Sequence, residues 1–163
     1  GYHNTRILVA SSSSQYEPHL NPYAASKHVI EHMEHTNICF MRFHTVYSEN
    51  PRKDMFFDKL LNGGLKYITN HERDFIHVSD VCSAIKLIMS LDIKGSLDVG
   101  TGTSSKIHCM VRSLPLKINP RERQKTKANT KLLRSLGFKC TIDLETFLID
   151  NWDRITKANP GLF

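Results

Sequence analysis

Apolar runs and small polar residues alternate along the first third of the chain. The apolar run 7–10 ends in small polar residues, which is typical of a buried parallel strand. The segment 37–43, apolar through its middle, predicts a second strand. Pro22 stands where it can open a helix, and the composition from Tyr23 to about Glu34 favours that helix. This order predicts a βαβ unit, and therefore a parallel sheet with a right-handed crossover.

The rest of the chain is divided into shorter pieces. In chain order they are a helix at 55–61, a glycine turn at 63–64, strands at 65–69 and 74–78, a helix at 78–90 and a glycine turn at 100–102. Gly137 is placed to cap a helix over 130–136, and Asp143 to cap a last helix from 144 to about 155. Pieces of this kind add a second, mixed α/β region to the parallel sheet.

Composition is that of an ordinary globular domain. The 163 residues, 40% of them hydrophobic, are enough for one compact domain with a core. No stretch approaches the roughly 20 apolar residues that a membrane span needs, and no signal peptide opens the chain. The four cysteines, Cys39, Cys82, Cys109 and Cys140, are widely separated. They predict reduced, mostly buried thiols in a cytoplasmic protein and exclude a C-x-x-C zinc or redox motif.

The net charge of +6 suits an anionic ligand. Part of it lies in one basic stretch: Arg121, Arg123, Lys125, Lys127, Lys131 and Arg134. Few aromatic residues interleave with these charges and no nucleic-acid motif is visible, so we interpret the stretch as a solvated face and expect no nucleic-acid partner.

Tyr23 and Lys27 carry the most informative chemistry. Four residues apart on a helix, they share one face. A phenol normally titrates near pH ~10, and a neighbouring ammonium lowers its pKa towards the range of a general base. A hydroxyl cluster, 11–14, lies just upstream. The alternative is a surface helix that carries a tyrosine and a lysine by chance.

The whole run from Ile7 to Lys27 resembles the catalytic segment of an extended short-chain dehydrogenase/reductase, the family of NAD-dependent nucleotide-sugar epimerases and dehydratases. Further segments resemble the family in order and spacing: 41–47, 51–55, 73–81, 97–102, and 133–138 with 144–145. The subgroup it resembles is the UDP-glucuronate 4-epimerase type, because Thr45-Val46-Tyr47 and the segment 52–55 occur together.

The resemblance implies an α/β fold: the C-terminal half of a Rossmann-like parallel sheet plus a small α/β substrate domain. Residues 1–50 would form the partial Rossmann-like part with the Tyr-Lys helix, and 51–163 mainly the substrate-binding part. The implied reaction is NAD-dependent hydride transfer at C4 of a UDP-sugar.

The sequence departs from the family pattern at the cofactor-binding loop and in the loop that precedes Tyr23. No glycine-rich dinucleotide loop is present in the sequence, so we expect a C-terminal portion that binds NAD poorly and is inactive alone. Only the eight residues Gln15 to Pro22 separate Ser14 from Tyr23, a shorter loop than the family's, and Ser48 replaces a common glycine. We therefore also expect one of two kinds of partner. Either another chain supplies the missing half, or the protein associates with itself at an exposed sheet edge.

The resemblance assigns roles around the reacting sugar. Ser12 would be the catalytic hydroxyl, and Tyr23 the base that takes the 4-hydroxyl proton. Lys27 would lower the tyrosine's pKa and bind the nicotinamide ribose. His44 would lie near the nicotinamide, where the family usually has an aromatic residue.

A second set would bind the rest of the sugar nucleotide. Ser13 and Ser14 would face the sugar, Arg73 the diphosphate and Glu122 the uridine ribose.

Thr45 and Arg52 would contact a sugar carboxylate, for which a guanidinium is suited because its donor fork matches two oxygens. The alternative is that Arg52 is merely solvated beside Asp54.

No metal site is predicted. His28, His32 and His35 fall on one helical stripe, but no acid or cysteine completes a ligand set, which favours a polar helix face. Two other functions stay open: a sugar-nucleotide dehydratase or reductase, although dehydratases commonly place an Asp-Glu pair where this chain has Ser13-Ser14, and a non-catalytic binding or assembly module.

Overall fold

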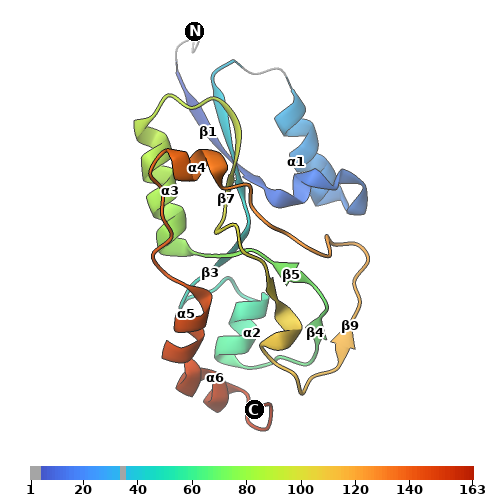
Figure 1. Cartoon of the computed structure of the whole chain (residues 1–163). Coiled ribbons are helices and arrows are strands. Elements are labelled where there is room, and N and C mark those ends of the chain that lie inside the picture. The colour runs from blue at the N-terminus through green and yellow to red at the C-terminus, as the bar shows by residue number, and fades with distance from the viewer. Residues whose placement is uncertain (1–4, 34–35) are drawn as a thin grey trace.

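The computed structural model describes residues 5–33 and 36–163. Its upper part is a three-stranded parallel sheet in the order β1-β2-β7, formed by β1 (Ile7–Ser12), β2 (Ile38–Phe43) and β7 (Gly95–Val99) (Figure 1). Register places Ile7 opposite Ile38 and Arg42 opposite Asp98. The predicted βαβ unit with its parallel sheet is therefore confirmed.

Two helices cover the two faces of this sheet. Helix α1 (Pro22–His32) connects β1 to β2, and α3 (Val78–Ser90) precedes β7. Asn21 caps α1 by accepting a hydrogen bond from the N–H of Ala24, and Pro22 is the first helical residue. The end predicted at Glu34 lies outside the described residues.

The lower part of the molecule is assembled from short elements around α2 (Phe56–Asn62). Three two-stranded pairs lie here: β3 (Thr45–Tyr47) with β6 (Phe75–His77), β4 (Ile68–Thr69) with β9 (Leu116–Lys117), and β5 (Glu72–Arg73) with β8 (Ser105–Lys106). The first two pairs are parallel and the third is antiparallel.

Short helices complete the chain. They are η1 (Ser13–Tyr16), η2 (Pro18–Leu20), η3 (Ile107–Cys109), α4 (Lys131–Ser135), α5 (Leu144–Asp150) and α6 (Trp152–Ala158). Asp143 caps α5 as predicted, accepting from the N–H groups of Glu145 and Thr146. Gly137 follows α4 with a positive φ of 92°, as expected of a residue that ends a helix.

Two predicted elements are wrong in extent. The strand expected at 65–69 is reduced to Ile68–Thr69, because only these residues pair with another strand. The last helix is two helices, α5 and α6, which meet at Asn151. The Asn151 side chain donates to the carbonyl of Phe147, so it competes for a backbone acceptor as asparagine commonly does.

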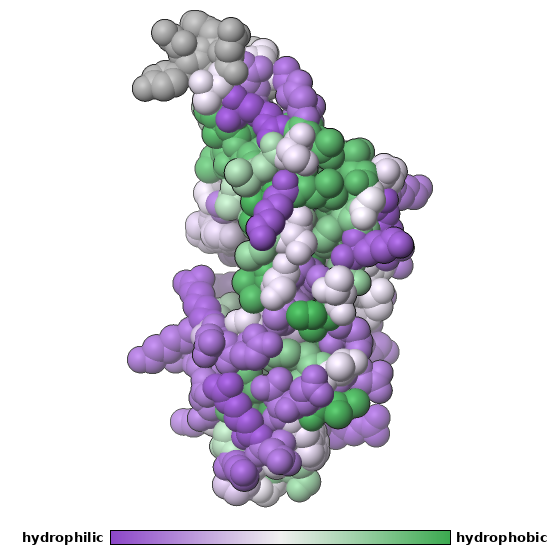
Figure 2. Space-filling model, turned by 90° about the vertical axis from the view of Figure 1, so that its left-hand side faces the viewer, coloured by the Kyte–Doolittle hydropathy of each residue, from purple (hydrophilic) through white to green (hydrophobic). Residues whose placement is uncertain are grey.

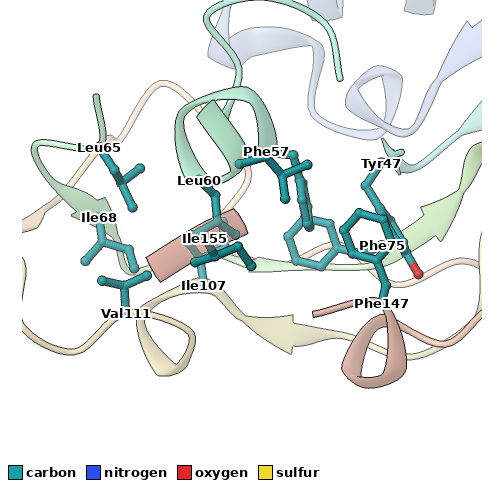
Figure 3. Packing of buried hydrophobic residues seen from close by; sticks show 11 residues of the cluster. Tyr47, Phe57, Leu60, Leu65, Ile68, Phe75, Ile107, Val111, Phe147 and Ile155 are labelled. Atoms are coloured by element: carbon teal, nitrogen blue, oxygen red, sulfur yellow. The ribbon is translucent and has the colours of Figure 1, made fainter. Parts of the chain in front are cut away.

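Two hydrophobic clusters form the core. The upper cluster packs α3 against one face of the sheet, with Val81, Ala84 and Ile88 on Met41 and Leu97. Figure 3 shows the lower cluster, whose aromatic rings come from β3, α2, β6 and α5: Tyr47, Phe57, Phe75 and Phe147. From the side, hydrophobic residues gather in the upper half of the surface and hydrophilic residues dominate the lower half (Figure 2).

The cysteine prediction was only partly right. Cys39 is buried, but Cys82, Cys109 and Cys140 are exposed, and all four are free thiols. Cys82 is exposed because it lies outside the stripe of α3 that faces the core, which includes Val81, Ala84 and Ile88.

Asp74, the residue before β6, is the buried carboxylate that accepts the most hydrogen bonds among the described residues. It is fully buried and accepts hydrogen bonds from the N–H groups of Thr101, Gly102 and Ala128, at 2.8 to 2.9 Å. A side chain on Gly100 would meet Ala128 and Asp74, so this close approach requires glycine. One carboxylate thus fastens the glycine turn after β7 to the segment before α4.

Replacement of Asp74 by alanine leaves three backbone N–H groups without their acceptor. Because each buried unsatisfied group costs about 1–3 kcal/mol, we expect Asp74→Ala to lower the free energy of unfolding by at least about 3 kcal/mol. Urea denaturation followed by circular dichroism measures this. The control is Asp150→Ala, at an exposed position, which should change stability by less than about 0.5 kcal/mol; equal effects of the two changes would refute the role given to Asp74.

Candidate active site

A pocket of about 320 Å³ lies at the carboxyl ends of β1 and β2. Residues proposed from the sequence that line it are Ser12, Ser13, Ser14, Tyr23, His44, Thr45, Arg73 and Glu122. Lys27 and Arg52 are not among its lining residues. A set drawn from four separate stretches of sequence is therefore brought to one cavity, at the edge where ligands bind in open parallel α/β sheets.

Tyr23 and Lys27 stand one turn apart near the start of α1. The Tyr23 side chain is 55% exposed and borders the pocket. The ammonium of Lys27 lies 5.8 Å from the centre of the Tyr23 ring and donates to the carbonyl of Ala10 at 3.0 Å. The helical spacing therefore pairs the two residues, but the lysine nitrogen is bound to strand β1.

The serine cluster forms the turn between β1 and η1. Ser12 is the N-cap of η1, where its hydroxyl accepts from the N–H of Ser14 at 3.1 Å. The carbonyl of Ser13 accepts from Arg123 at 3.0 Å. Ser11, which we did not place in the site, donates to the carboxylate of Glu31.

Arg73 and Glu122 face each other across the pocket wall. Arg73 Nη2 lies 3.0 Å from Glu122 Oε2, and its other terminal nitrogen donates to the carbonyls of Glu72 and Arg123. Burial lowers the pKa of Arg73, and the charge of Glu122 opposes that shift. The Glu122 side chain is 53% exposed and that of Arg73 12%, so the guanidinium borders the pocket with a carboxylate as its neighbour.

Arg52 lies apart from the other candidates. It is exposed on the loop before α2, and the described residues include no ion pair between Arg52 and Asp54. Met55, three residues later in the same loop, does line the pocket.

His44 lies at the buried end of the pocket lining. Its imidazole is fully buried, and Nε2 is 3.5 Å from Asp98 Oδ2. Asp98 in turn accepts from the Tyr16 hydroxyl at 2.7 Å and from the N–H of Asn129 at 2.8 Å. The His44 side chain is thus held against a carboxylate from the neighbouring strand.

Tyr16, Arg42, Asp98 and Arg123 were missed from the sequence. Arg42 donates to the Tyr16 hydroxyl at 2.9 Å, and the Tyr16 ring contacts the guanidinium groups of both Arg42 and Arg123. Burial, together with Asp98, raises the pKa of Tyr16. The only sequence signal was the position of Arg42 and Asp98 near the ends of apolar strands, which does not reveal that they are register partners.

Two histidines of the predicted stripe, His28 and His32, contact backbone carbonyls. His28 and His32 stack at 3.9 Å, and their Nδ1 atoms lie within hydrogen-bond distance of the carbonyls of Gln15 and His28. His35 lies outside the described residues. Within the described part of the chain, no three histidine, cysteine or acidic side chains are grouped to bind a metal.

Comparison with known families gives a match over much of the chain. The model of the NAD dependent epimerase/dehydratase family matches residues 3–100, more than half of the sequence. The chain belongs to this family.

Solved structures of the epimerase/dehydratase family confirm the α/β fold. MoeE5 in complex with UDP-glucuronic acid and NAD is 26% identical with a TM-score of 0.72, and the match covers 93% of this chain and 65% of that chain. The UDP-glucuronic acid 4-epimerase from Bacillus cereus, in complex with UDP-glucuronic acid and NAD, is 22% identical with a TM-score of 0.73, covering 93% and 62%. TunA, an NAD-dependent NDP-hexosamine 5,6-dehydratase, is 20% identical with a TM-score of 0.73, covering 91% and 63%.

This epimerase/dehydratase chain thus spans under two thirds of the length of those solved chains. A search of curated proteins returned no match. In the described ranges, no helix has the length and apolar character to cross a bilayer.

The lowered pKa of Asp98 indicates how the stability of this family member should depend on pH. Burial by itself would raise the pKa of Asp98, but His44, the Asn129 N–H and Tyr16 lower it overall. A carboxyl with a lowered folded-state pKa stabilises the fold above its unfolded pKa, and this stabilisation is lost as the pH falls through the folded value. We therefore expect the free energy of unfolding to fall as the pH drops below the ordinary aspartate pKa of about 4.

Urea denaturation at a series of pH values tests this expectation. Asp98→Asn should flatten the acid limb relative to the wild type, whatever its effect on stability at neutral pH. The exposed Asp150→Asn is the matched control, and an acid limb in Asp98→Asn as steep as in that control would contradict the assignment.

Proposed function

We propose that this chain carries the sugar-nucleotide site of an NAD-dependent UDP-sugar 4-epimerase of the UDP-glucuronate or UDP-hexose class. The observation that supports this most directly is the pocket that Ser12, Tyr23, Arg73 and Thr45 line together. A hydroxyl, a phenol and a guanidinium in one cavity match a sugar that must be deprotonated at one end and held by a diphosphate at the other.

A second pocket adjoins the first. It measures about 440 Å³, shares Met55 and Glu122 with the first, and continues along 64–69. Its wall is more apolar, with Phe56 and Tyr67 among its residues. The two cavities together suit an elongated ligand with an anionic centre near Arg73 and a ring at the far end.

In this proposal, each catalytic role is assigned to a residue of this chain. Tyr23 removes and returns the 4-hydroxyl proton, and Ser12 hydrogen-bonds the same oxygen. Lys27, one helical turn from Tyr23, binds the nicotinamide ribose in this proposal. NAD, when bound, would supply the hydride acceptor, and we propose Tyr23 and His44 as the residues at its nicotinamide end.

The residues present fit only part of that cofactor. The tyrosine-lysine end is present, but the sequence has no glycine-rich loop for the pyrophosphate. We therefore propose that the 163-residue chain binds the sugar nucleotide more readily than NAD and does not turn over by itself. Measurable epimerisation by this chain alone would refute the second part.

Binding of UDP-glucuronate and UDP-glucose, measured by isothermal titration calorimetry, tests the sugar-nucleotide site. A hydrogen bond to a charged group contributes about 1.5–3 kcal/mol, so Arg73→Ala should raise the Kd of both ligands roughly 10- to 100-fold. Arg112→Ala, an exposed arginine that lines neither cavity, is the control and should leave both values unchanged. Absence of binding by the wild-type chain, together with a stable oligomer in solution, would favour the non-catalytic assembly module.

A change at Arg52 tests which of the two sugars the site prefers. It does not test whether a sugar-nucleotide site exists. If it closes over the pocket to contact a carboxylate, Arg52→Ala should weaken UDP-glucuronate binding about 10-fold and leave UDP-glucose unaffected. The neighbouring exposed Lys53→Ala controls for the loss of a positive charge from the same loop. Equal, small effects on both sugars would support the solvated alternative.

A further inference from the structure

Arg123 brings a second guanidinium group to the candidate pocket. It lines the cavity with Arg73 and Glu122, and these three are the described lining residues that carry a formal charge. The wall of the pocket therefore has two positive groups and one negative group. An excess of positive charge in a partly enclosed site favours an anionic ligand.

The protein itself uses only part of the Arg123 guanidinium. Nη1 donates to the carbonyl of Ser13 at 3.0 Å, and the Tyr16 ring lies 5.2 Å from Cζ. Nε is buried and has no hydrogen-bond partner within the described residues, although Glu17 Oε1 is 3.5 Å away. Because an unpaired buried donor is costly, a donor of this kind beside a pocket points to an acceptor that the ligand brings.

The bond to Ser13 leaves one edge of the guanidinium for recognition. Nε and Nη2 form that edge, and a carboxylate binds two parallel N–H groups more strongly than one. The contacts with Ser13 and Tyr16 already restrict the side chain, so binding costs less of its conformational freedom. Arg123 is therefore preorganised to bind a carboxylate.

The two guanidinium groups of the pocket are separated by the Arg123 side chain. Arg73 Nη1 donates to the backbone carbonyl of Arg123 at 2.7 Å, while the guanidinium of Arg123 lies at Ser13. Burial lowers the pKa of Arg73, and the positive charge of Arg123 lowers it further. A ligand with two anionic groups relieves this repulsion when each group meets one guanidinium.

A sugar ring that carries a diphosphate on one side and a carboxylate on the other has this arrangement of charge. Ser13 follows Ser12, the hydroxyl proposed for the reacting oxygen, so the Arg123 end of the pocket is the sugar end in the proposed function. Arg52, which the sequence suggested for a carboxylate, is exposed and does not line the pocket. Arg123 is therefore better placed for that contact than Arg52.

We propose that Arg123 determines the specificity of the pocket for an acidic sugar. Its Nε and Nη2 groups bind the carboxylate of a uronate, and Arg73 binds the diphosphate. The inference rests on the proposed function for the nucleotide part of the ligand, and it narrows the substrate class to nucleotide sugars that carry a carboxylate. Glu17, beside Nε, is a competing carboxylate that the ligand displaces.

Isothermal titration calorimetry of the 163-residue chain with UDP-glucuronate, UDP-glucose and UDP tests the assignment. Arg123→Gln removes the charge and the donor fork, so the Kd of UDP-glucuronate should rise at least about 10-fold. The values for UDP-glucose and UDP should stay unchanged, which separates a carboxylate contact from a distorted pocket. Arg121→Gln, at an exposed position of the same segment that does not line the pocket, is the matched control and should bind all three ligands like the wild type.

Removal of the competing carboxylate should have the opposite effect. Glu17→Gln removes the negative charge beside Nε of Arg123. The variant should therefore bind UDP-glucuronate about 2- to 5-fold more tightly than the wild type, with the Kd of UDP-glucose unchanged.

A probe without the nucleotide makes one result independent of the proposed function. In proton–nitrogen correlation spectra, the Nε–H signal of Arg123 is assigned by its loss in Arg123→Gln. This signal should shift on addition of glucuronate and stay in place on addition of glucose, because only glucuronate carries a carboxylate.

Two calorimetric outcomes would overturn the inference. One is an equal loss of affinity for all three ligands in Arg123→Gln, which would assign Arg123 to the diphosphate or to the fold, and the other is an unchanged Kd of UDP-glucuronate. If the wild type binds neither UDP-sugar, the proposed function is wrong. A glucuronate-specific shift at Arg123 would then still support the carboxylate site, and its absence would overturn the inference as well.

Discussion

The hydrogen bonds around Asp74 are the interaction on which the rest of the structure depends. Its carboxylate binds the turn after β7 and the segment before α4, its backbone carbonyl accepts from Thr45, and its N–H donates to Thr126. Thr45 and Thr126 both line the pocket. A buried carboxylate with several backbone donors is well stabilised, because each donor is worth more away from water. The pocket wall is thus built around a residue that does not itself line the pocket.

The two faces of the sheet differ in their contacts, and the contrast explains how helix α1 is positioned. On the α3 side, Met41, Leu97 and Val99 form ordinary hydrophobic contacts. On the α1 side, the buried Phe40 is accompanied by charged groups, with Glu31 bound to Arg42. Buried ion pairs add little net stability, but they restrict geometry because other arrangements leave a charge unpaired. The helix that carries Tyr23 is therefore held by directional contacts, and much of its apolar surface is left outside.

How far the fold could be predicted depended on the range of the interactions involved. Helix α1 and helix α3 follow from local signals, the Asn21-Pro22 start and the apolar spacing over 78–90, and both were predicted nearly to their bounds. The break at Asn151 and the two-residue strand at Ile68 depend on single side-chain contacts and strand partners, which periodicity does not reveal. The candidate site divides in the same way. Most of the residues that line its pocket were proposed from motifs, whereas the neighbouring contacts among Asp98, Tyr16 and Arg42 became visible only when strand register placed them together.

The sequence by itself determined the family, the parallel βαβ unit and the residue types available for chemistry, because these depend on motif order, local propensity and hydrophobic period. Only the tertiary structure decided which partner each of those residues has. Tyr23 and Lys27 are one helical turn apart in any helix, but the position of the ammonium depends on strand β1, whose Ala10 carbonyl accepts its hydrogen bond. Arg73 and Glu122 are far apart in sequence and become an ion pair only when the lower strands bring them to the same wall. Spacing along the chain governs short-range geometry, whereas the partner of a charged group depends on segments that meet only after folding.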